Sequence, residues 1–428
     1  MSTITKKKKL VPELRFSGFS GEWNKTRIQK LIDEKSITSH LDGNHGALYP
    51  KSSEFTEAGI PYVTANDFKN GYVNLENSKR LPLHRAKQFK KGVSKSGDVL
   101  FAHNATVGPA AVLETDLNYV VLSTTATYFR FDSEKINNHF FKYTLLSQNF
   151  INQYTRVMSQ STRDQVPITT QRKFVVSLPP ILEQQKIADF LGSVDAWLDN
   201  LHGQKTALQS YKQGMMQKLF TGQVRFKDEN GRNFPEWQEV SMSDIGDSFG
   251  GLSGKSGDDF GQGESFITYK QIFDDSVIEP KKFAKVTVAP GEKQNRAQKG
   301  DVFFTVSSET PNEVGYASVL MEDVNPYLNS FAFGFRPKSL TDLLPEYSRY
   351  HFRSAPFRRQ VVRLAQGSTR YNISKVQFMK LIIEIPSASE QQKIADFLTA
   401  LDQTITTKAE EITRVEKWKK GLMQKMFV

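Results

Sequence analysis

The chain has 428 residues and no cysteine, which excludes a disulfide framework, a thiolate metal site and a cysteine nucleophile. Its formal net charge of +11 favours a polyanionic partner, most often nucleic acid, although a charge that serves only solubility is the alternative. No apolar run approaches the roughly 18 residues of a membrane span, so we expect a cytoplasmic protein with no membrane partner.

The chain begins MSTITKKKKL, a charged stretch with no apolar segment behind it. This pattern is not that of a signal peptide. We predict a basic flexible tail over residues 1–12, in which Lys6–Lys9 contacts phosphates without sequence preference.

Residues 13–178 predict a first globular α/β domain. Short β-type runs bounded by turn-forming residues occur at Pro61–Thr64, Asp98–Phe101 and Val120–Leu122. The segment 136–156 has the pattern of one or two helices.

Residues 179–222 predict a long helix. From Ile187 to Leu219, apolar residues recur at alternating steps of four and three, the spacing of a coiled-coil seam. Pro179 and Pro180 end the preceding segment. A helix of about 37 residues would be about 55 Å long.

The rest of the chain repeats this order, with a second domain over 223–385 and a second long helix over 386–428. Glu183–Leu191 and Glu390–Leu398 both read EQQKIADFL. Ser389 with Gln392 fits a capping box at the start of the second helix. A repeat of this length indicates two domain-sized units. We therefore predict an α+β fold with a pseudo-twofold internal repeat, its two helices paired antiparallel in an intramolecular coiled coil.

The two globular parts share only a framework. Gly97–Phe101 (GDVLF) matches Gly300–Phe304 (GDVFF), and the motif Ser-Thr-Arg precedes both helices. The segments Ser36–Glu57 and Asp247–Glu264 have almost nothing in common. This contrast indicates that the two domains share one scaffold but carry different recognition segments.

Catalytic motifs are absent. Gly250–Ser256 ends like a phosphate-binding loop, but Phe249 stands where that loop needs its first glycine, and no helical pattern comes after it. The chain has no Asn-Pro-Pro-aromatic run, no GxSxG elbow and no histidine spacing typical of a metal site. We expect no catalytic residue, no metal site and no cofactor.

A proline followed by EQQKIADFL and a long helix that ends in Met-Gln-Lys, twice in one chain, closely resembles the specificity (S, HsdS) subunits of type I restriction–modification systems. The resemblance covers essentially the whole chain, and the GDVLF, GDVFF and Ser-Thr-Arg segments share it.

The resemblance implies two globular target recognition domains separated by two long antiparallel conserved helices. It implies a non-catalytic subunit that recognises an asymmetric bipartite sequence in double-stranded DNA, each domain reading one half. The helices set the gap of unspecified bases and dock two adenine-methyltransferase (modification) subunits, which use S-adenosylmethionine. Two ATP-dependent restriction/translocase subunits complete the restriction complex.

Candidate DNA-binding residues are polar side chains in strand-like loops, since Asn and Gln suit adenine and Arg and Lys suit guanine. The first domain offers Thr64, Asn66, Asn104 and Thr106, and the second Thr268, Lys270, Gln271, Ser307 and Ser308. Arg163 and Arg370 recur at equivalent places, so we assign them to phosphate contacts or a hinge.

Two other readings of the chain remain. A self-sufficient enzyme that fuses specificity with methyl transfer would need the cofactor and catalytic motifs that are missing. A structural coiled-coil DNA organiser would bind DNA without sequence preference, through phosphate contacts alone.

Overall fold

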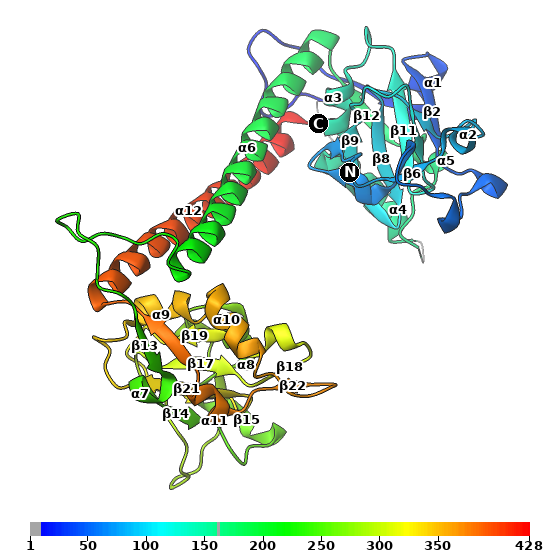
Figure 1. Ribbon diagram of the computed structural model, residues 1–428. Helices are drawn as coiled ribbons and strands as arrows, with labels where there is room; N and C mark the ends of the chain where they lie inside the picture. The colour runs from blue at the N-terminus through cyan, green and yellow to red at the C-terminus, as the bar shows by residue number, and fades with distance from the viewer. Residues whose placement is uncertain (1–9, 161–162) are drawn as a thin grey trace, which may run out of the picture. The chain divides into compact units, whose positions relative to one another are not determined.

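The computed structural model describes residues 10–160 and 163–428, and the chain divides into two compact units (Figure 1). The first unit comprises 1–202 and 410–428, and the second comprises 203–409. Each long helix is therefore shared, so that each unit consists of a globular domain and half of each helix. Ser161 and Thr162 of the first Ser-Thr-Arg motif, and residues 1–9 of the expected tail, lie outside the described residues.

The end of the expected tail is held against the first unit. Leu10 is half-buried, and its carbonyl accepts a hydrogen bond of 2.8 Å from the backbone N–H of Trp23. Trp23 itself is buried and lies edge-on to Phe140. Ordered structure therefore begins before residue 12.

The first unit is built on two sheets and a small two-stranded pair, with strand orders β2-β11-β8-β9-β5-β4, β6-β3-β10-β7 and β1-β12. The strands are β1 (Asn24–Arg27), β2 (Ile37–Asp42), β3 (Ile60–Val63), β4 (Phe68–Lys69), β5 (Tyr72–Val73), β6 (Lys79–Leu81), β7 (Val93–Ser94), β8 (Val99–Asn104), β9 (Thr106–Val112), β10 (Val120–Leu122), β11 (Ala126–Phe131) and β12 (Val175–Leu178). The helices are α1 (Ile28–Asp33), α2 (Leu83–Ala86), α3 (Asn138–Leu145), α4 (Gln148–Met158) and α5 (Ile168–Gln171), with 3-10 turns η1 (Gly46–Leu48), η2 (Ser52–Glu54) and η3 (Ala65–Asp67).

The β-type runs of the sequence correspond to β3, β8 and β10, and the helical segment 136–156 corresponds to α3 and α4. Val99, Leu100 and Phe101 are completely buried, since both faces of β8 are covered. A continuous apolar run is the pattern of a strand in this position. Asn137 and Ser147 cap α3 and α4 with their side chains, which explains why one helical pattern forms two helices.

The second unit has sheets of strand order β14-β21-β17-β19, β16-β15-β20, β13-β23 and β18-β22. Its strands are β13 (Gln238–Ser241), β14 (Gly246–Gly250), β15 (Phe260–Ile267), β16 (Ala284–Val286), β17 (Val302–Thr305), β18 (Ser307–Ser308), β19 (Ala317–Val319), β20 (Tyr327–Leu328), β21 (Ala332–Pro337), β22 (Tyr371–Asn372) and β23 (Ile382–Ile385). Its short helices are α7 (Met242–Ile245), α8 (Tyr269–Asp274), α9 (Pro345–His351), α10 (Ala355–Val362) and α11 (Lys375–Met379), with 3-10 turns η4 (Gly257–Asp259), η5 (Pro280–Lys282) and η6 (Pro311–Glu313).

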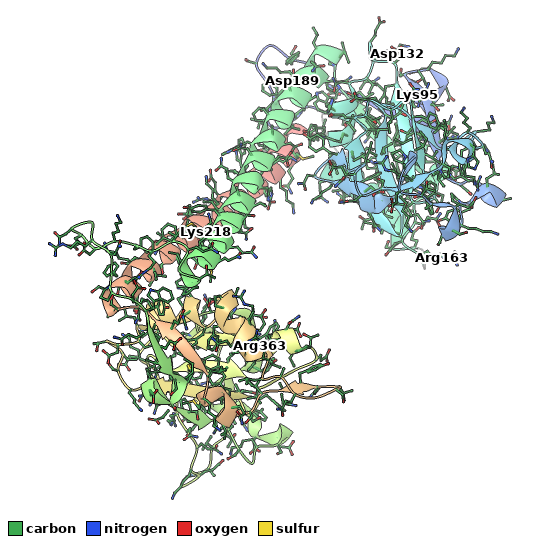
Figure 2. All side chains as sticks on the ribbon, viewed as in Figure 1. Lys95, Asp132, Arg163, Asp189, Lys218 and Arg363 are labelled. Atoms are coloured by element: carbon green, nitrogen blue, oxygen red, sulfur yellow. The ribbon has the colours of Figure 1, made fainter. Side chains whose placement is uncertain are left out.

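The long helices are α6 (Ile181–Phe220) and α12 (Ala388–Met426). Figure 2 labels Asp189 and Lys218 toward the two ends of α6. In the first unit, Val194, Leu198 and Leu201 of α6 pack with Ile412 and Val415 of α12. Every position of the seam from Ile187 to Leu219 is buried or half-buried, and so is the position 207 residues after it in α12.

An aromatic contact joins α6 to α12 within each unit. In the first unit, Phe190 of α6 contacts Trp418 of α12. In the second, Tyr211 of α6 contacts Phe397 of α12. The predicted capping box is wrong in one respect, because α12 already begins at Ala388 and Ser389 therefore lies inside the helix.

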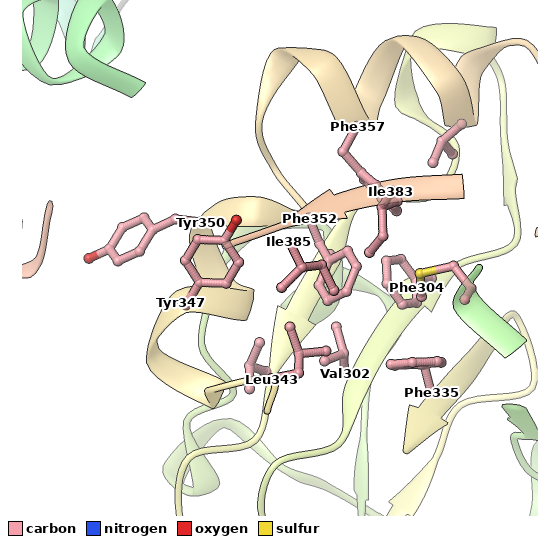
Figure 3. Packing of buried hydrophobic residues seen from close by; sticks show 14 of the residues in the cluster. Val302, Phe304, Phe335, Leu343, Tyr347, Tyr350, Phe352, Phe357, Ile383 and Ile385 are labelled. Carbon is pink, nitrogen blue, oxygen red and sulfur yellow. The ribbon is translucent and has the colours of Figure 1, made fainter. Parts of the chain in front are cut away.

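A core rich in phenylalanine holds the second unit together (Figure 3). Phe304 of β17 lies against the rings of Phe333 and Phe378, with centroid distances of 5.4 and 4.6 Å. Phe352 and Phe357 cover the same ring from the helical side. Burying a phenylalanine side chain contributes about 1.5–3 kcal/mol, so this cluster fixes the sheet against α9 and α10.

The repeated motif EQQKIADFL makes the same contacts in both units. Glu183 is fully buried and accepts hydrogen bonds from Arg15 and the indole of Trp23. Glu390 is likewise buried and accepts from Arg225 and Trp237. A buried carboxylate must be paired to be tolerated, which explains why glutamate, and not merely a helix-forming residue, stands at this position.

A second polar cluster joins each globular domain to the helices. Asp195 of α6 accepts a 2.6 Å hydrogen bond from the hydroxyl of Tyr143 and forms an ion pair with Lys419 of α12. At the repeat offset, Asp402 of α12 accepts a 2.8 Å bond from Tyr350 and pairs with Lys212 of α6 at 2.5 Å. These groups tie α3 or α9 to both long helices.

The variable segments leave the sheet at a glycine in both units. A Cβ on Gly43, after β2, would lie 2.0 Å from the carbonyl oxygen of Ser123. A Cβ on Gly251, after β14, would lie 2.0 Å from the carbonyl oxygen of Asn329. Both distances are shorter than any real contact, so only glycine allows the backbones to approach this closely.

The segments Ser36–Glu57 and Asp247–Glu264 are therefore not loops throughout. Each contains a strand that pairs antiparallel with the equivalent partner of its unit, β2 with β11 and β14 with β21. Beyond the glycine, the first continues through η1 and η2, whereas the second continues through η4 into β15. A phosphate-binding loop would need a helix after Gly250–Ser256, but this segment is followed by η4 and then by the strand β15.

None of the helices in the described part of the chain is both long enough and apolar enough to cross a membrane.

Candidate nucleic-acid interface

In the first unit, the end of β8 lies against the segment that comes after Arg163. The backbone N–H of Val166 donates to the carbonyl of His103 at 2.8 Å, and that of Ala105 donates to Asp164 at 3.0 Å. Ala105 has a positive φ of 64° and turns the chain from β8 into β9. Asn104, Thr106 and Arg163 are thereby brought together at one edge.

Thr64 and Asn66 lie beside this edge. The backbone N–H of Ala65, between them, donates to Thr125 Oγ1 at 2.9 Å, and the Thr125 carbonyl accepts from His103. The Thr64 hydroxyl donates to Asp67 and caps η3, whereas Asn66 is exposed. Thr64 therefore supports the turn that presents Asn66.

Most of the side chains at this edge of the first unit are polar and exposed to solvent. Asn104 is half-buried, while Thr106, Asn66 and Arg163 are exposed. Figure 2 places Arg163 on the side of the first unit opposite Lys95 and Asp132. The arrangement offers amide, hydroxyl and guanidinium groups together, which is the set that reads base edges and phosphates.

The second unit repeats the backbone arrangement with other side chains. The N–H of Ile373 donates to the carbonyl of Val306 at 3.1 Å, as Val166 does to His103. Beyond that point, Ser307 and Ser308 form β18 and pair with Asn372 and Tyr371 of β22. Arg370 precedes β22, so Ser307, Ser308 and Arg370 also meet at one edge.

This second edge contains a pocket of about 380 Å³, called here the aromatic pocket. Its walls combine aromatic, hydroxyl and charged side chains: Tyr269, Phe273, Ser307, Ser308, Glu309, Glu313, Phe331 and Arg370. Such walls can stack against a ring and hydrogen-bond to its edge.

The hydroxyls of the pocket are oriented by neighbouring groups. The Tyr269 hydroxyl donates to the Ser307 carbonyl at 2.6 Å, and Ser308 Oγ donates to Glu313 at 2.8 Å. Burial raises the pKa of Tyr269, which therefore stays a neutral donor at neutral pH. Phe331 remains 57% exposed, so an apolar ring lies open at the pocket.

The three candidates on α8 have different surroundings. Lys270 is exposed and pairs with Asp274, and Thr268 caps the helix. Gln271 is 3% exposed, and its Nε2 donates to the Glu279 carbonyl at 2.7 Å. Gln271 therefore has almost no surface to offer a base in this conformation, because it lies on the inner face of the short helix.

Five pocket residues were not among the sequence candidates, namely Tyr269, Phe273, Glu309, Glu313 and Phe331. They come from three separate segments, which no local pattern joins. The spacing of Tyr269 and Phe273, four apart on one helix face, was the available signal. In the described residues, no group of three or more His, Asp or Glu side chains is placed to hold a metal ion.

Comparison with known proteins is consistent with this geometry. A family model described as the type I restriction modification DNA specificity domain matches residues 34–210 and 235–417. The MjaX relative of Methanocaldococcus jannaschii, a putative type I restriction enzyme specificity subunit, is 26% identical over 353 residues, 76% of each chain. The MjaVIII specificity subunit of the same organism is 24% identical over 213 residues, 49% of this chain and about half (48%) of that relative.

Solved structures share the fold. A chain from a study of complex assembly and conformational transition of the type I R-M system has a TM-score of 0.62 at 19% identity, covering 95% of this chain and 97% of that one. The HsdS subunit from Thermoanaerobacter tengcongensis has a TM-score of 0.50 at 19% identity, with coverages of 95% and 96%. Because the family model spans most of the sequence in two matching segments, the chain belongs to the type I restriction–modification DNA specificity family.

Proposed function

We propose that the chain is the DNA sequence-specificity subunit of a type I restriction–modification complex and recognises an asymmetric, bipartite target. The recognition domains are residues 13–178 and 223–385. The observation that carries the proposal is the pair of equivalent edges: the same backbone hydrogen bonds present Asn104 and Thr106 in one unit and Ser307 and Ser308 in the other. Different side chains on one framework are what two unrelated half-sites require.

The helices α6 and α12 form an intramolecular coiled coil of residues 179–222 and 386–428, related by a pseudo-twofold. They dock two adenine-methyltransferase subunits, and two ATP-dependent restriction/translocase subunits join the complex in the cytoplasm. The subunit itself is non-catalytic. The paired Asp195 and Asp402 clusters support this arrangement, because each fixes its domain to both helices.

The test is to co-express the chain with a type I methyltransferase subunit from the same genome and to map methylated adenines across the host genome. We expect one bipartite motif with a fixed gap, which disappears when this chain is omitted. Replacing Asn44–Glu57, the variable part beyond Gly43, is expected to change one half only. Scattered methylation, or none, would instead favour the DNA organiser that binds without sequence preference.

A further inference from the structure

Each unit has a groove between a long helix and its globular domain. In the second unit, α6 contributes Gln209, Lys212, Gln213, Met216 and Gln217. In the first unit, α12 contributes the five residues at the repeat offset, Glu416, Lys419, Lys420, Met423 and Gln424. The grooves measure about 830 and 520 Å³. They are therefore equivalent places in the two halves of the chain.

The two grooves differ in charge. The second groove, called here the arginine groove, is lined by Arg353, Arg358, Arg359 and Arg363. The residues at the same offset in the first unit are Leu146, Ile151, Asn152 and Arg156. Asp195, Asp199 and Glu416 line the first groove, whereas no carboxylate appears among the described residues that line the arginine groove.

Two of the arginines are fixed in place by neutral groups. Arg353 donates to backbone carbonyls, including Ala317 at 2.6 Å, and Arg358 donates to the Asn312 carbonyl at 2.8 Å. Both guanidinium groups lie over the ring of Tyr316, at 5.3 and 4.6 Å. Carbonyls and a ring orient these side chains without neutralising them, so their charge is available to an anion.

Burial lowers the pKa of Arg353 to about 10, still well above neutral pH, so the guanidinium keeps its charge. Arg358 Nη1 is buried without a hydrogen-bond partner within the described part of the chain. Arg359 and Arg363 are exposed at the end of α10. Among the described residues, neither of these two forms an ion pair.

The arginine groove adjoins the aromatic pocket. The 3-10 turn η6 lies between them, since Asn312 lines the groove and the next residue, Glu313, lines the pocket. The ring of Phe273 in the pocket lies 4.9 Å from the ring of Tyr316 in the groove. A ligand that places a base at the pocket would therefore place its backbone near the arginines.

We propose that the arginine groove binds the phosphate backbone of double-stranded DNA beside the second half-site, and that the equivalent groove of the first unit does not. Arginine forks match phosphate geometry, and their contacts carry no sequence information. The proposal rests on the proposed function and adds to it an unequal anchoring of the two half-sites.

The test uses the full chain in complex with its methyltransferase subunit. The probes are a duplex with the mapped target and a duplex without it, and binding is measured over a series of salt concentrations. The double variant R359Q/R363Q changes only exposed side chains. Each lost phosphate contact changes the slope of log K against log salt by about 0.9, so we expect a slope less negative by about 1.8 on both duplexes.

The matched control is R156Q, which alters the counterpart of Arg363 in the first unit. We expect an unchanged slope for R156Q and an unchanged methylation motif for both variants. An unaltered slope for R359Q/R363Q at an unaltered melting temperature overturns the proposal. So does a loss of methyltransferase co-purification without a change in slope, since it would assign the groove to an acidic protein surface.

The two proposals fail separately. A wild-type complex with no preference for the mapped duplex contradicts the specificity function. The difference in salt slope between R359Q/R363Q and R156Q can still be read on either duplex.

Discussion

In the first unit, the carboxylate of Asp195 is 7% exposed and Lys142 beside it is 3% exposed. In the second unit, the equivalent carboxylate of Asp402 is 28% exposed and Arg349 is 22% exposed. Both carboxylates accept a hydrogen bond from a tyrosine and pair with a lysine of the other long helix. The two halves thus keep the same contacts but bury them to different extents. We therefore expect the more buried contact, in the first unit, to contribute more to the free energy of unfolding.

The largest effect is expected from Asp195→Ala. Removing this carboxylate leaves the buried Lys142 without its counter-charge, and breaking a buried pair costs about 3–5 kcal/mol. Asp402→Ala leaves half-exposed partners that water can reach, so we expect about 1–3 kcal/mol. Urea unfolding followed by tryptophan fluorescence measures both. Equal losses in the two variants would show that depth does not decide the contribution.

The candidate DNA-binding edges of the two units differ in the type of side chain that they present, not in how deeply those side chains are buried. Asn104→Ala is expected to relax discrimination at one base position of the first half-site by about 1–3 kcal/mol, because a bidentate amide contact is lost. Ser307→Ala is the matched change in the second unit. Competition binding with single-base variants of the target checks both. A variant that alters both half-sites would contradict independent reading.

Acid is expected to destabilise both units, most strongly through His40 in the first and His351 in the second. His40 and His351 are buried, and burial lowers the pKa of each from 6.5 to about 3. Between those values the unfolded state binds more protons than the folded state. Stability is therefore full above pH 6.5 and falls as pH is lowered, by about 1.4 kcal/mol per pH unit for each histidine.

Urea midpoints between pH 7.5 and pH 5 measure this dependence. His40 contacts Gln171, and His351 contacts the Tyr347 hydroxyl. Replacing either histidine with glutamine should reduce the slope by one histidine's share. A slope that stays the same in both variants would assign the acid sensitivity to other groups.

The smallest effect is expected where the two units are most alike. Arg163→Gln and Arg370→Gln alter the arginine of each Ser-Thr-Arg motif, and both arginines are exposed. If each contacts a phosphate, each variant weakens binding equally on all sequences and changes the salt slope by about 0.9. Methylation mapping should return the same motif. A changed base preference would show instead that these arginines contact bases.

Much of the framework could be predicted because it arises from periodic patterns. The apolar spacing from Ile187 to Leu219 predicts a long helix and the apolar run Val99–Phe101 predicts a strand, and both elements form as expected. The predicted start of α12 is wrong, because Ser389 and Gln392 resemble a capping box in sequence whereas the helix already begins at Ala388. Local sequence patterns therefore predict where a helix or strand lies better than they predict the residue at which it begins or ends.

The candidate interface was predictable only in part. Ser307, Ser308 and Arg370 are joined by backbone pairing that continues from a recognisable strand. Phe331 lies in the turn between β20 and β21, so its place in the pocket depends on the tertiary fold. Gln271 has suitable chemistry, but the inward face of α8 buries it. The type of a residue suggests whether it could contact a base, but burial in the folded protein decides whether it is accessible to DNA.

Gly43 and Gly251 bear on how such a protein can acquire a new target. Each lets the backbone leave the sheet through a gap too narrow for any other residue. The segment beyond each glycine is free to change in length and in secondary structure, as the 3-10 turns after Gly43 and the strand after Gly251 already do. The two glycines are therefore natural junctions for grafting, provided that the graft keeps apolar side chains at the core-packed positions Leu252 and Phe55.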